Sequence, residues 1–125
     1  MKIGDIILIP FPFAELTNIK VRPAVVLTQT ADKYKDIVVS AISSVLPDKI
    51  SNREFVLSPD KINKLRVKSV VKADRIVTLK QGSKIADLGK LSSRELATYK
   101  RILAEIISWA LMVNYFVPDK LYRTY

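Results

Sequence analysis

The sequence predicts a mainly β domain that ends in one long helix. Three observations support this fold class. Short runs of β-branched residues fill the first two thirds of the 125-residue chain, turn residues separate these runs, and the apolar pattern changes to helical spacing near residue 92. No helical periodicity lies between the runs, so we expect the strands to pair antiparallel, in a sandwich or a small barrel.

Six runs are the expected strands, and we place them in one domain that spans residues 1–125, with the β unit over about 1–90. In chain order they read "DIILIPF", "AVVLTQ", "DIVVSAI", "REFVLS", "KSVVKA" and "RIVTLK". Their Val, Ile and Phe content suits a pleated, half-buried surface. After the fourth run, "SPDKINKL" is expected to contain one short helical turn following Pro59.

The C-terminal helix is expected over about residues 92–114. Ser92 and Glu95 form an S-x-x-E capping box, in which each side chain satisfies a backbone donor of the first turn. The helix is expected to cover the open face of the sheet with an apolar stripe, made of Leu96, Tyr99, Leu103, Ile106, Ala110 and Val113. The tail 115–125 is aromatic and basic. The sequence leaves three possibilities for this tail: it docks on the domain, it binds a partner, or it stays loose.

The composition favours a polyanionic partner. Lys and Arg number 21 and Asp and Glu 12, which gives a net charge of +9, and such a surface attracts phosphates by releasing their counterions. A basic surface that serves only solubility is the alternative. No apolar run approaches the length of a membrane span, and the N-terminal segment does not resemble a signal peptide, so we expect a cytoplasmic protein without a membrane partner.

The chain has no Cys and no His. This excludes disulfides, thiolate catalysis, zinc-finger sites and histidine acid–base chemistry, and we expect no metal and no cofactor. Candidate functional side chains gather at the ends of the predicted strands: Asp5, Lys20, Arg22, Ser43, Ser44, Lys72 and Asp74. Each also has an ordinary structural interpretation, as a turn residue or an exposed charge.

Together these residues fit the cleavage of RNA without a metal. Such a site needs a cation against the phosphate, donors for the oxygen that gains charge, and groups that move protons. The planar fork of Arg22 can contact two phosphate oxygens at once. Lys72 and Asp74 share a face if their segment is extended. Asp74 or Asp5 could accept the proton, whereas Arg22, with a pKa above about 12, is a poor base.

The chain resembles the MazF/PemK family of bacterial toxins, the endoribonuclease components of type II toxin–antitoxin systems. The resemblance extends from about residue 3 to residue 113 and rests on the order and spacing of several stretches. They are "GDIILIPFPF", "RPAVVL", "AISS", "VVKADRIVTL", "DLGKLS" and the terminal helix.

The resemblance implies an SH3-like barrel with a C-terminal helix, a homodimer, a single-stranded RNA substrate and a cognate antitoxin. The catalytic arginine of the family's "RP" motif falls on Arg22, the hydroxyl residue after the third strand on Ser43, and an arginine–x–aspartate on Lys72 and Asp74. The early acidic residue falls on Asp5. Ser43 stands where the family often has threonine, so the hydroxyl is kept but the methyl that restrains its rotamer is lost. Lys72 stands where some members have arginine, so the charge is kept but a bidentate contact with phosphate is lost.

We therefore expect a metal-independent, sequence-specific mRNA endoribonuclease that leaves 2′,3′-cyclic phosphate and 5′-hydroxyl ends. Arg22, Ser43 and Asp74 are the expected catalytic residues, while the expected substrate-binding residues are Asp5, Lys20, Ser44 and Lys72. Two alternatives stay open. One is a toxin of the CcdB type, which binds DNA gyrase and cleaves nothing, and the other is a nucleic-acid-binding module without catalysis.

Overall fold

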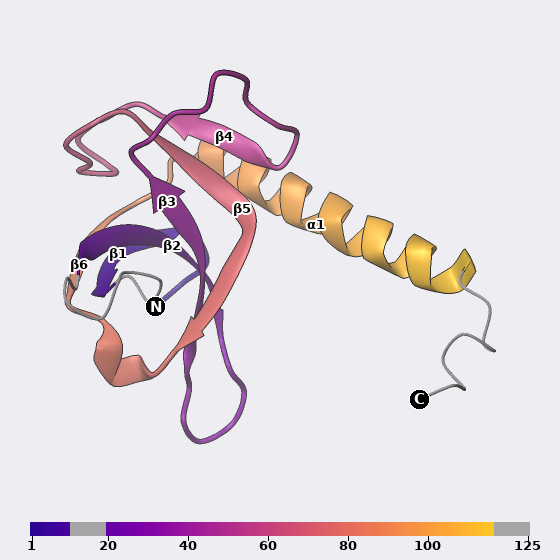
Figure 1. Cartoon of the computed structure of the whole chain (residues 1–125). Helices are drawn as coiled ribbons and strands as arrows, with labels where there is room; N and C mark the ends of the chain where they lie inside the picture. The colour runs from indigo at the N-terminus through magenta and orange to yellow at the C-terminus, as the bar shows by residue number, and fades with distance from the viewer. Residues whose placement is uncertain (11–19, 117–125) are drawn as a thin grey trace.

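A computed structural model of the chain describes residues 1–10 and 20–116 and contains six strands and one long helix (Figure 1). The helix α1 is Ser93–Phe116, and a 3-10 turn, η1, spans Gln81–Ser83. The strands are β1 Asp5–Pro10, β2 Val21–Gln29, β3 Ile37–Ser43, β4 Glu54–Leu57, β5 Ser69–Leu79 and β6 Ala86–Lys90. The mainly β fold with a C-terminal helix is confirmed.

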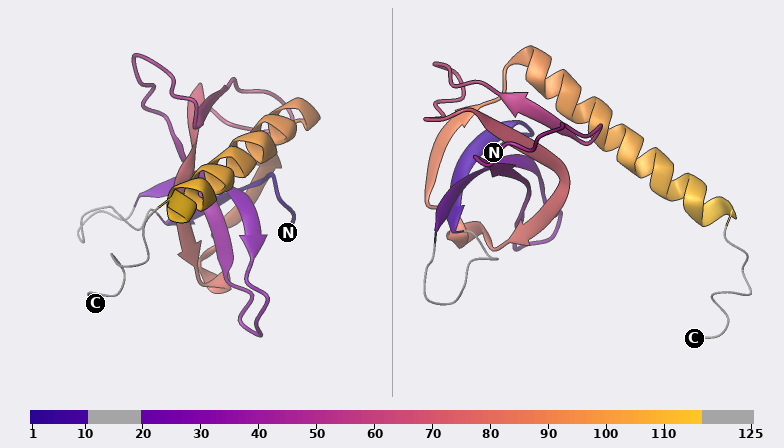
Figure 2. Two further views of the ribbon diagram at one scale, coloured as in Figure 1. Left: turned by 90° about the vertical axis from the view of Figure 1, so that its right-hand side faces the viewer. Right: turned by 45° about the horizontal axis from the view of Figure 1, so that its top comes forward.

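All six strands form one antiparallel sheet in the order β4-β5-β3-β2-β1-β6. The sheet curls into a half-barrel, with α1 running along one side of it (Figure 2). The last two predicted runs are one strand, because β5 continues past a register shift opposite Ser40 and Ala41. The strand β6 has no β-branched residue, and its pairing with the edge of β1 places it in the sheet.

Two apolar cores lie on opposite faces of the sheet, because successive side chains of a strand point to opposite sides. The barrel core lines the face enclosed by the curl and contains Ile7, Ile9, Ala24, Val26, Ile37 and Val39. The helix-side core lies under α1 and contains Ile6, Val25, Ile42, Leu57, Leu65, Val71, Ala73, Leu91, Tyr99, Ile102 and Leu103.

The helix α1 covers the sheet with its N-terminal half only. The capping box is present: Ser92 N donates to Glu95 Oε1 at 2.8 Å, and Glu95 N donates to Ser92 Oγ at 3.2 Å. Tyr99 and Leu103 are buried, as the predicted stripe requires, whereas Ala110 is exposed. The C-terminal half projects beyond the sheet (Figures 1 and 2).

The predicted tail 115–125 begins inside α1, and residues 117–125 lie outside the described part of the chain. The expected helical turn after Pro59 is present: Lys64 N donates a hydrogen bond to the carbonyl oxygen of Asp60, at 3.0 Å. Within residues 1–10 and 20–116, no helix is long and apolar enough to cross a membrane.

Candidate active site

Arg22 and Ser43 lie on neighbouring strands, on the face of the barrel core. Ala24 of β2 pairs with Ala41 of β3, and the same register continued by two residues aligns Arg22 with Ser43. Arg22 precedes Ala24 by two residues and therefore shares its face. The Arg22 side chain is half-buried, and its Nε is shielded from solvent. The buried part of the Arg22 side chain thus restricts the orientation of its guanidinium group.

The hydroxyl of Ser43 is oriented by the turn that follows β3. Its oxygen accepts a hydrogen bond from Val45 N at 3.1 Å. The carbonyl oxygen of Val45 is 3.5 Å from Ser43 Oγ, which is too long for a strong bond from the hydroxyl. The hydroxyl proton can therefore turn to a phosphate oxygen. Ser44, the next residue, is exposed.

Lys72 of β5 extends the same row of side chains. It pairs with Ala41 on one side and Glu54 on the other, so it is a diagonal neighbour of Ser43, about 7–8 Å away by the usual sheet spacing. Lys72 Nζ lies 3.9 Å from Glu54 Oε2. Arg22, Ser43 and Lys72 therefore bring two cations and a hydroxyl to one face of three adjacent strands.

Glu54 is a member of this group that the sequence analysis missed. A hydrogen bond from Ser51 N, at 3.0 Å, lowers the pKa of the Glu54 carboxyl, and the charge of Lys72 lowers it further against the opposing effect of burial. The carboxyl is therefore ionised at neutral pH. Its only sequence signal is a position at the start of the fourth run, and its partner depends on how β4 aligns with β5.

Asp74 has a different partner from Lys72. Its Oδ2 lies 3.9 Å from Arg53 Nη1, and the guanidinium of Arg53 lies over the ring of Trp109 on α1, 5.3 Å from the ring centroid. The register shift in β5 falls between Lys72 and Ile76 and interrupts the alternation of side chains there. The structure thus gives Lys72 and Asp74 separate ion pairs instead of one shared cluster.

Asp5 is not brought together with Arg22. On β1, Ile9 pairs with Arg22, and Asp5 precedes Ile9 by four residues, about 13 Å along a strand. Asp5 Oδ2 accepts a hydrogen bond from Lys2 N at 2.8 Å. It lines a different cavity, of about 660 Å³, at the start of α1. Lys20 is exposed, directly before β2 and two residues from Arg22.

The described acidic residues do not gather into a set of three or more that could hold a metal ion. Next to the barrel core, the face that carries Arg22 also carries the hydroxyl of Ser43 and the cation of Lys72. These side chains can bind a phosphate and stabilise charge that develops on it, and Glu54, beside Lys72, supplies a carboxylate.

Comparisons with known proteins agree with this fold. No curated protein matches the sequence. Among solved structures, the fold is similar to that of the Mycobacterium tuberculosis toxin MazF-mt6, with a TM-score of 0.64 and 17% sequence identity, over 83% of this chain and 96% of that one. Residues 2–107 match the family described as PemK-like, MazF-like toxin of type II toxin–antitoxin system. The chain therefore belongs to the MazF/PemK family of type II toxins.

Proposed function

We propose that this toxin is a metal-independent endoribonuclease that cuts single-stranded mRNA at specific sequences. The observation that carries the proposal is that Arg22 of β2 and Ser43 of β3 lie on one face of neighbouring strands, each two residues beyond the paired Ala24 and Ala41, and that Lys72 of β5 pairs with Ala41. Membership of the MazF/PemK family supports it. The net charge of +9 favours the same polyanionic substrate.

Each residue of the group has a role in this proposal. The guanidinium of Arg22 contacts two oxygens of the scissile phosphate and stabilises the charge that they gain. Ser43 and Ser44 donate hydrogen bonds to the phosphate. Lys20 and Lys72 bind the backbone on either side as point charges. In these roles the side chains bind and position the phosphate.

The 2′-hydroxyl of the RNA is the nucleophile in this mechanism. Its oxygen forms a bond to phosphorus as the bond to the 5′-oxygen breaks, which yields a 2′,3′-cyclic phosphate and a 5′-hydroxyl. The 2′-proton passes to a carboxylate, and the leaving oxygen receives a proton from Arg22. Because the nucleophile is already held beside the phosphate, positioning supplies much of the acceleration.

Asp74 is the carboxylate we assign to the proton transfer. It lies two residues from Lys72, whereas Asp5 is at the far end of its strand and is left as a contact for a distant part of the RNA. Glu54 is a second candidate, because it is ionised and lies 3.9 Å from Lys72. Asp74→Asn and Glu54→Gln, compared in single-turnover cleavage, separate the two: the variant of the true acceptor loses the larger part of the rate.

We further propose that the toxin acts in the cytoplasm as a homodimer and is silenced by its cognate antitoxin. The family implies an antitoxin. For the homodimer, the support is the C-terminal half of α1, where large apolar side chains are exposed: Ile107, Trp109, Leu111, Met112 and Val113. Exposed apolar groups this close together are typical of an interface.

Incubation of the purified protein with a long RNA in excess EDTA tests the activity. Cleavage at a recurring sequence supports the proposal. Binding without cleavage would indicate a nucleic-acid-binding module. If RNA is neither bound nor cut but DNA gyrase is captured, the alternative of a CcdB-type toxin applies.

A deoxyribose substitution tests the nucleophile. Replacing the single ribose on the 5′ side of the cut should abolish cleavage there and leave binding nearly unchanged, because phosphate charge dominates affinity. Continued cleavage at that bond, or products with a 5′-phosphate, would show that water attacks instead.

A further inference from the structure

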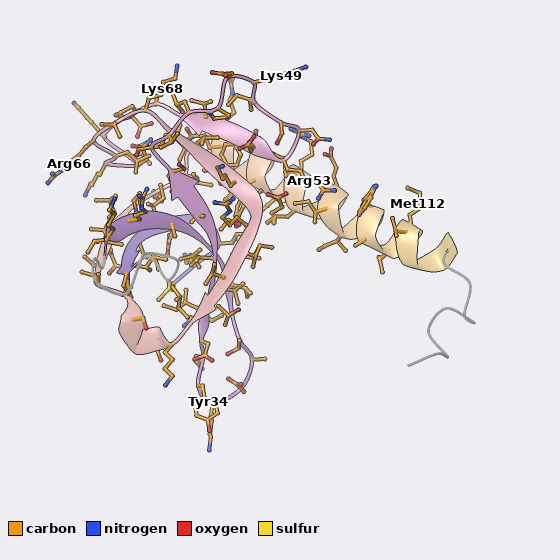
Figure 3. The ribbon with its side chains drawn as sticks, in the orientation of Figure 1. Tyr34, Lys49, Arg53, Arg66, Lys68 and Met112 are labelled. Atoms are coloured by element: carbon orange, nitrogen blue, oxygen red, sulfur yellow. The ribbon has the colours of Figure 1, made fainter. Side chains whose placement is uncertain are left out.

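The loop between β4 and β5, residues 58–68, presents an unbalanced group of cations. Lys61, Lys64, Arg66 and Lys68 are all exposed, and none of them forms a salt bridge with a described acidic residue. Arg66 and Lys68 point away from the sheet (Figure 3). Residues 61–73 contain no Asp or Glu. The loop therefore carries a local positive charge that attracts an anion.

The backbone of this loop is held in place by its own side chains. Asp60 Oδ1 accepts hydrogen bonds from Ile62 N at 2.8 Å and from Asn63 N at 2.7 Å. The buried Asn63 accepts from Leu65 N at 3.0 Å and donates from Nδ2 to the carbonyl oxygen of Ser58 at 2.9 Å. The cations thus extend from a preorganised frame, which reduces the entropic cost of binding a ligand.

The loop is also attached to the sheet. Lys90 N donates to the carbonyl oxygen of Ile62 at 3.1 Å, and Leu65 enters the helix-side core. Gly89 allows this approach, since a Cβ there would lie 2.4 Å from the Ile62 oxygen. The loop therefore covers the part of the apolar face that α1 leaves uncovered.

A cavity of about 380 Å³ lies beneath the loop, within the roughly 300–1,000 Å³ range of small-molecule sites. Lys64, Arg66 and Ser69 supply its polar groups. Its apolar lining is Leu8, Val21, Pro23, Leu65, Val67 and Leu88. An apolar hollow with cations at its border suits a ligand that joins a flat, weakly polar ring to an anionic group.

We propose that this cavity is a subsite for one nucleotide of the RNA, with the base in the apolar hollow and the adjacent phosphate on Lys64 and Arg66. The inference rests on the proposed function, since it concerns the same substrate. Val21 and Pro23, which line the cavity, flank Arg22 in β2. They point to the opposite face from Arg22, so the RNA passes over the start of β2 and places a flanking nucleotide in the cavity. The subsite thereby contributes to the choice of cleavage sequence.

The charge of the subsite is tested with Lys64→Asn/Arg66→Gln. Lys64 has a positive φ of 56°, and Asn tolerates that conformation better than Ala does. Lys33→Gln/Lys35→Asn is a matched control: it removes two charges from the β2–β3 hairpin, and Lys35 likewise has a positive φ, of 48°. Fluorescence anisotropy measures binding of an oligoribonucleotide that contains the cleavage sequence with deoxyribose at the cut, in a series of salt concentrations.

We expect the subsite variant to weaken binding about 10-fold and to reduce the slope of log K against log salt by about two, one for each phosphate that the variant no longer neutralises. The control should change both quantities much less. Equal effects of the two variants, with wild type cutting RNA normally, would overturn the subsite and leave the proposed function intact. A wild-type protein that neither binds nor cuts RNA would overturn the proposed function and the subsite with it.

The hollow itself is tested with single abasic sites in the same oligonucleotide. Wild type should bind about 10-fold more weakly when the abasic site is at one flanking position, because a stacked or buried base contributes that much to affinity. Val67→Trp, at a side chain that is 54% exposed, should fill the hollow and abolish the difference at that position, with an unchanged circular dichroism spectrum. Equal affinity of wild type for every abasic position would overturn the proposal.

Discussion

Ser40 Oγ lies 2.6 Å from the hydroxyl oxygen of Tyr99, and both side chains are buried. Ser40 Oγ also donates to the carbonyl oxygen of Ala73, at 2.9 Å. A serine hydroxyl has one proton, so Tyr99 must be the donor to Ser40. This chain of hydrogen bonds connects α1 to β3 and to β5, directly beside the register shift that separates Lys72 from Asp74.

The order of two destabilising effects follows from this arrangement. Tyr99→Phe removes one donor and leaves the Ser40 bond to Ala73 intact, so it should cost about 1 kcal/mol. Ser40→Ala leaves both Tyr99 and the Ala73 carbonyl without that partner, so it should cost about 2–4 kcal/mol. Urea denaturation of both variants measures the difference. A larger effect in Tyr99→Phe would mean that the ring packs differently from the structure.

Stability should also fall at high pH through Tyr99. Burial raises the pKa of its phenol above the ordinary value of 10.0. Above about pH 10 the unfolded chain loses this proton while the folded chain keeps it, so the free energy of unfolding decreases as the pH rises. Urea denaturation between about pH 8 and pH 11 should show a smaller decrease in Tyr99→Phe than in wild type. An identical decrease would assign the effect to other groups.

Arg22→Ala should abolish growth inhibition while the protein still folds. Removal of one preorganised charge stabiliser typically costs about 100- to 1,000-fold in rate. Arg22→Lys should recover little, because an ammonium cannot contact two phosphate oxygens in a plane. Cleavage of a defined RNA and a circular dichroism spectrum measure activity and folding. Lys20→Ala, two residues away and exposed, is the control and should affect binding alone; unchanged toxicity in folded Arg22→Ala would remove Arg22 from the site.

Gly89→Ala should destabilise the protein, and Gly82→Ala should not. At Gly89 a Cβ would lie 2.4 Å from the carbonyl oxygen of Ile62, which is backbone and cannot move aside alone, whereas nothing lies within 4 Å of a Cβ at Gly82. Overpacking of this kind costs about 1–3 kcal/mol. Thermal unfolding of both variants provides the comparison. Equal melting temperatures would show that the 58–68 loop is not held against β6.

If the toxin is the homodimer we propose, replacement of Ile107 and Leu111 by Asp should convert it into monomers. Their side chains are 60% and 64% exposed and lie one helical turn apart, so two carboxylates there would oppose an apolar contact between copies. Ile76→Asp is the control, at an exposed isoleucine on β5. Sedimentation measures the mass, which is 14.1 kDa for one chain. A wild-type mass near that value at micromolar concentration would contradict the homodimer.

Local sequence was enough to place most of the strands and the start of the helix. The β-branched runs from Asp5 to Leu57 match four strands, and the Ser92–Glu95 capping box places the first turn of α1. The strand β6 was not predicted. Its sequence "ADLGK" has no β-branched residue to indicate a strand, and it forms one because it pairs with the edge of β1. The register shift within β5 was not predicted either, because it arises from the pairing of β5 with β3.

The candidate site likewise has features that local sequence shows and features that depend on strand pairing. Several features are visible in the sequence alone: the net charge, the absence of Cys and His, and the position of Arg22 directly before Pro23 and an apolar run. Which of these groups meet depends on the strand register: it places Arg22 and Ser43 on one face, pairs Glu54 with Lys72, and leaves Asp5 four residues from the β1 partner of Arg22. Register is set by which faces are buried across the whole sheet, and no single segment of the chain carries that information.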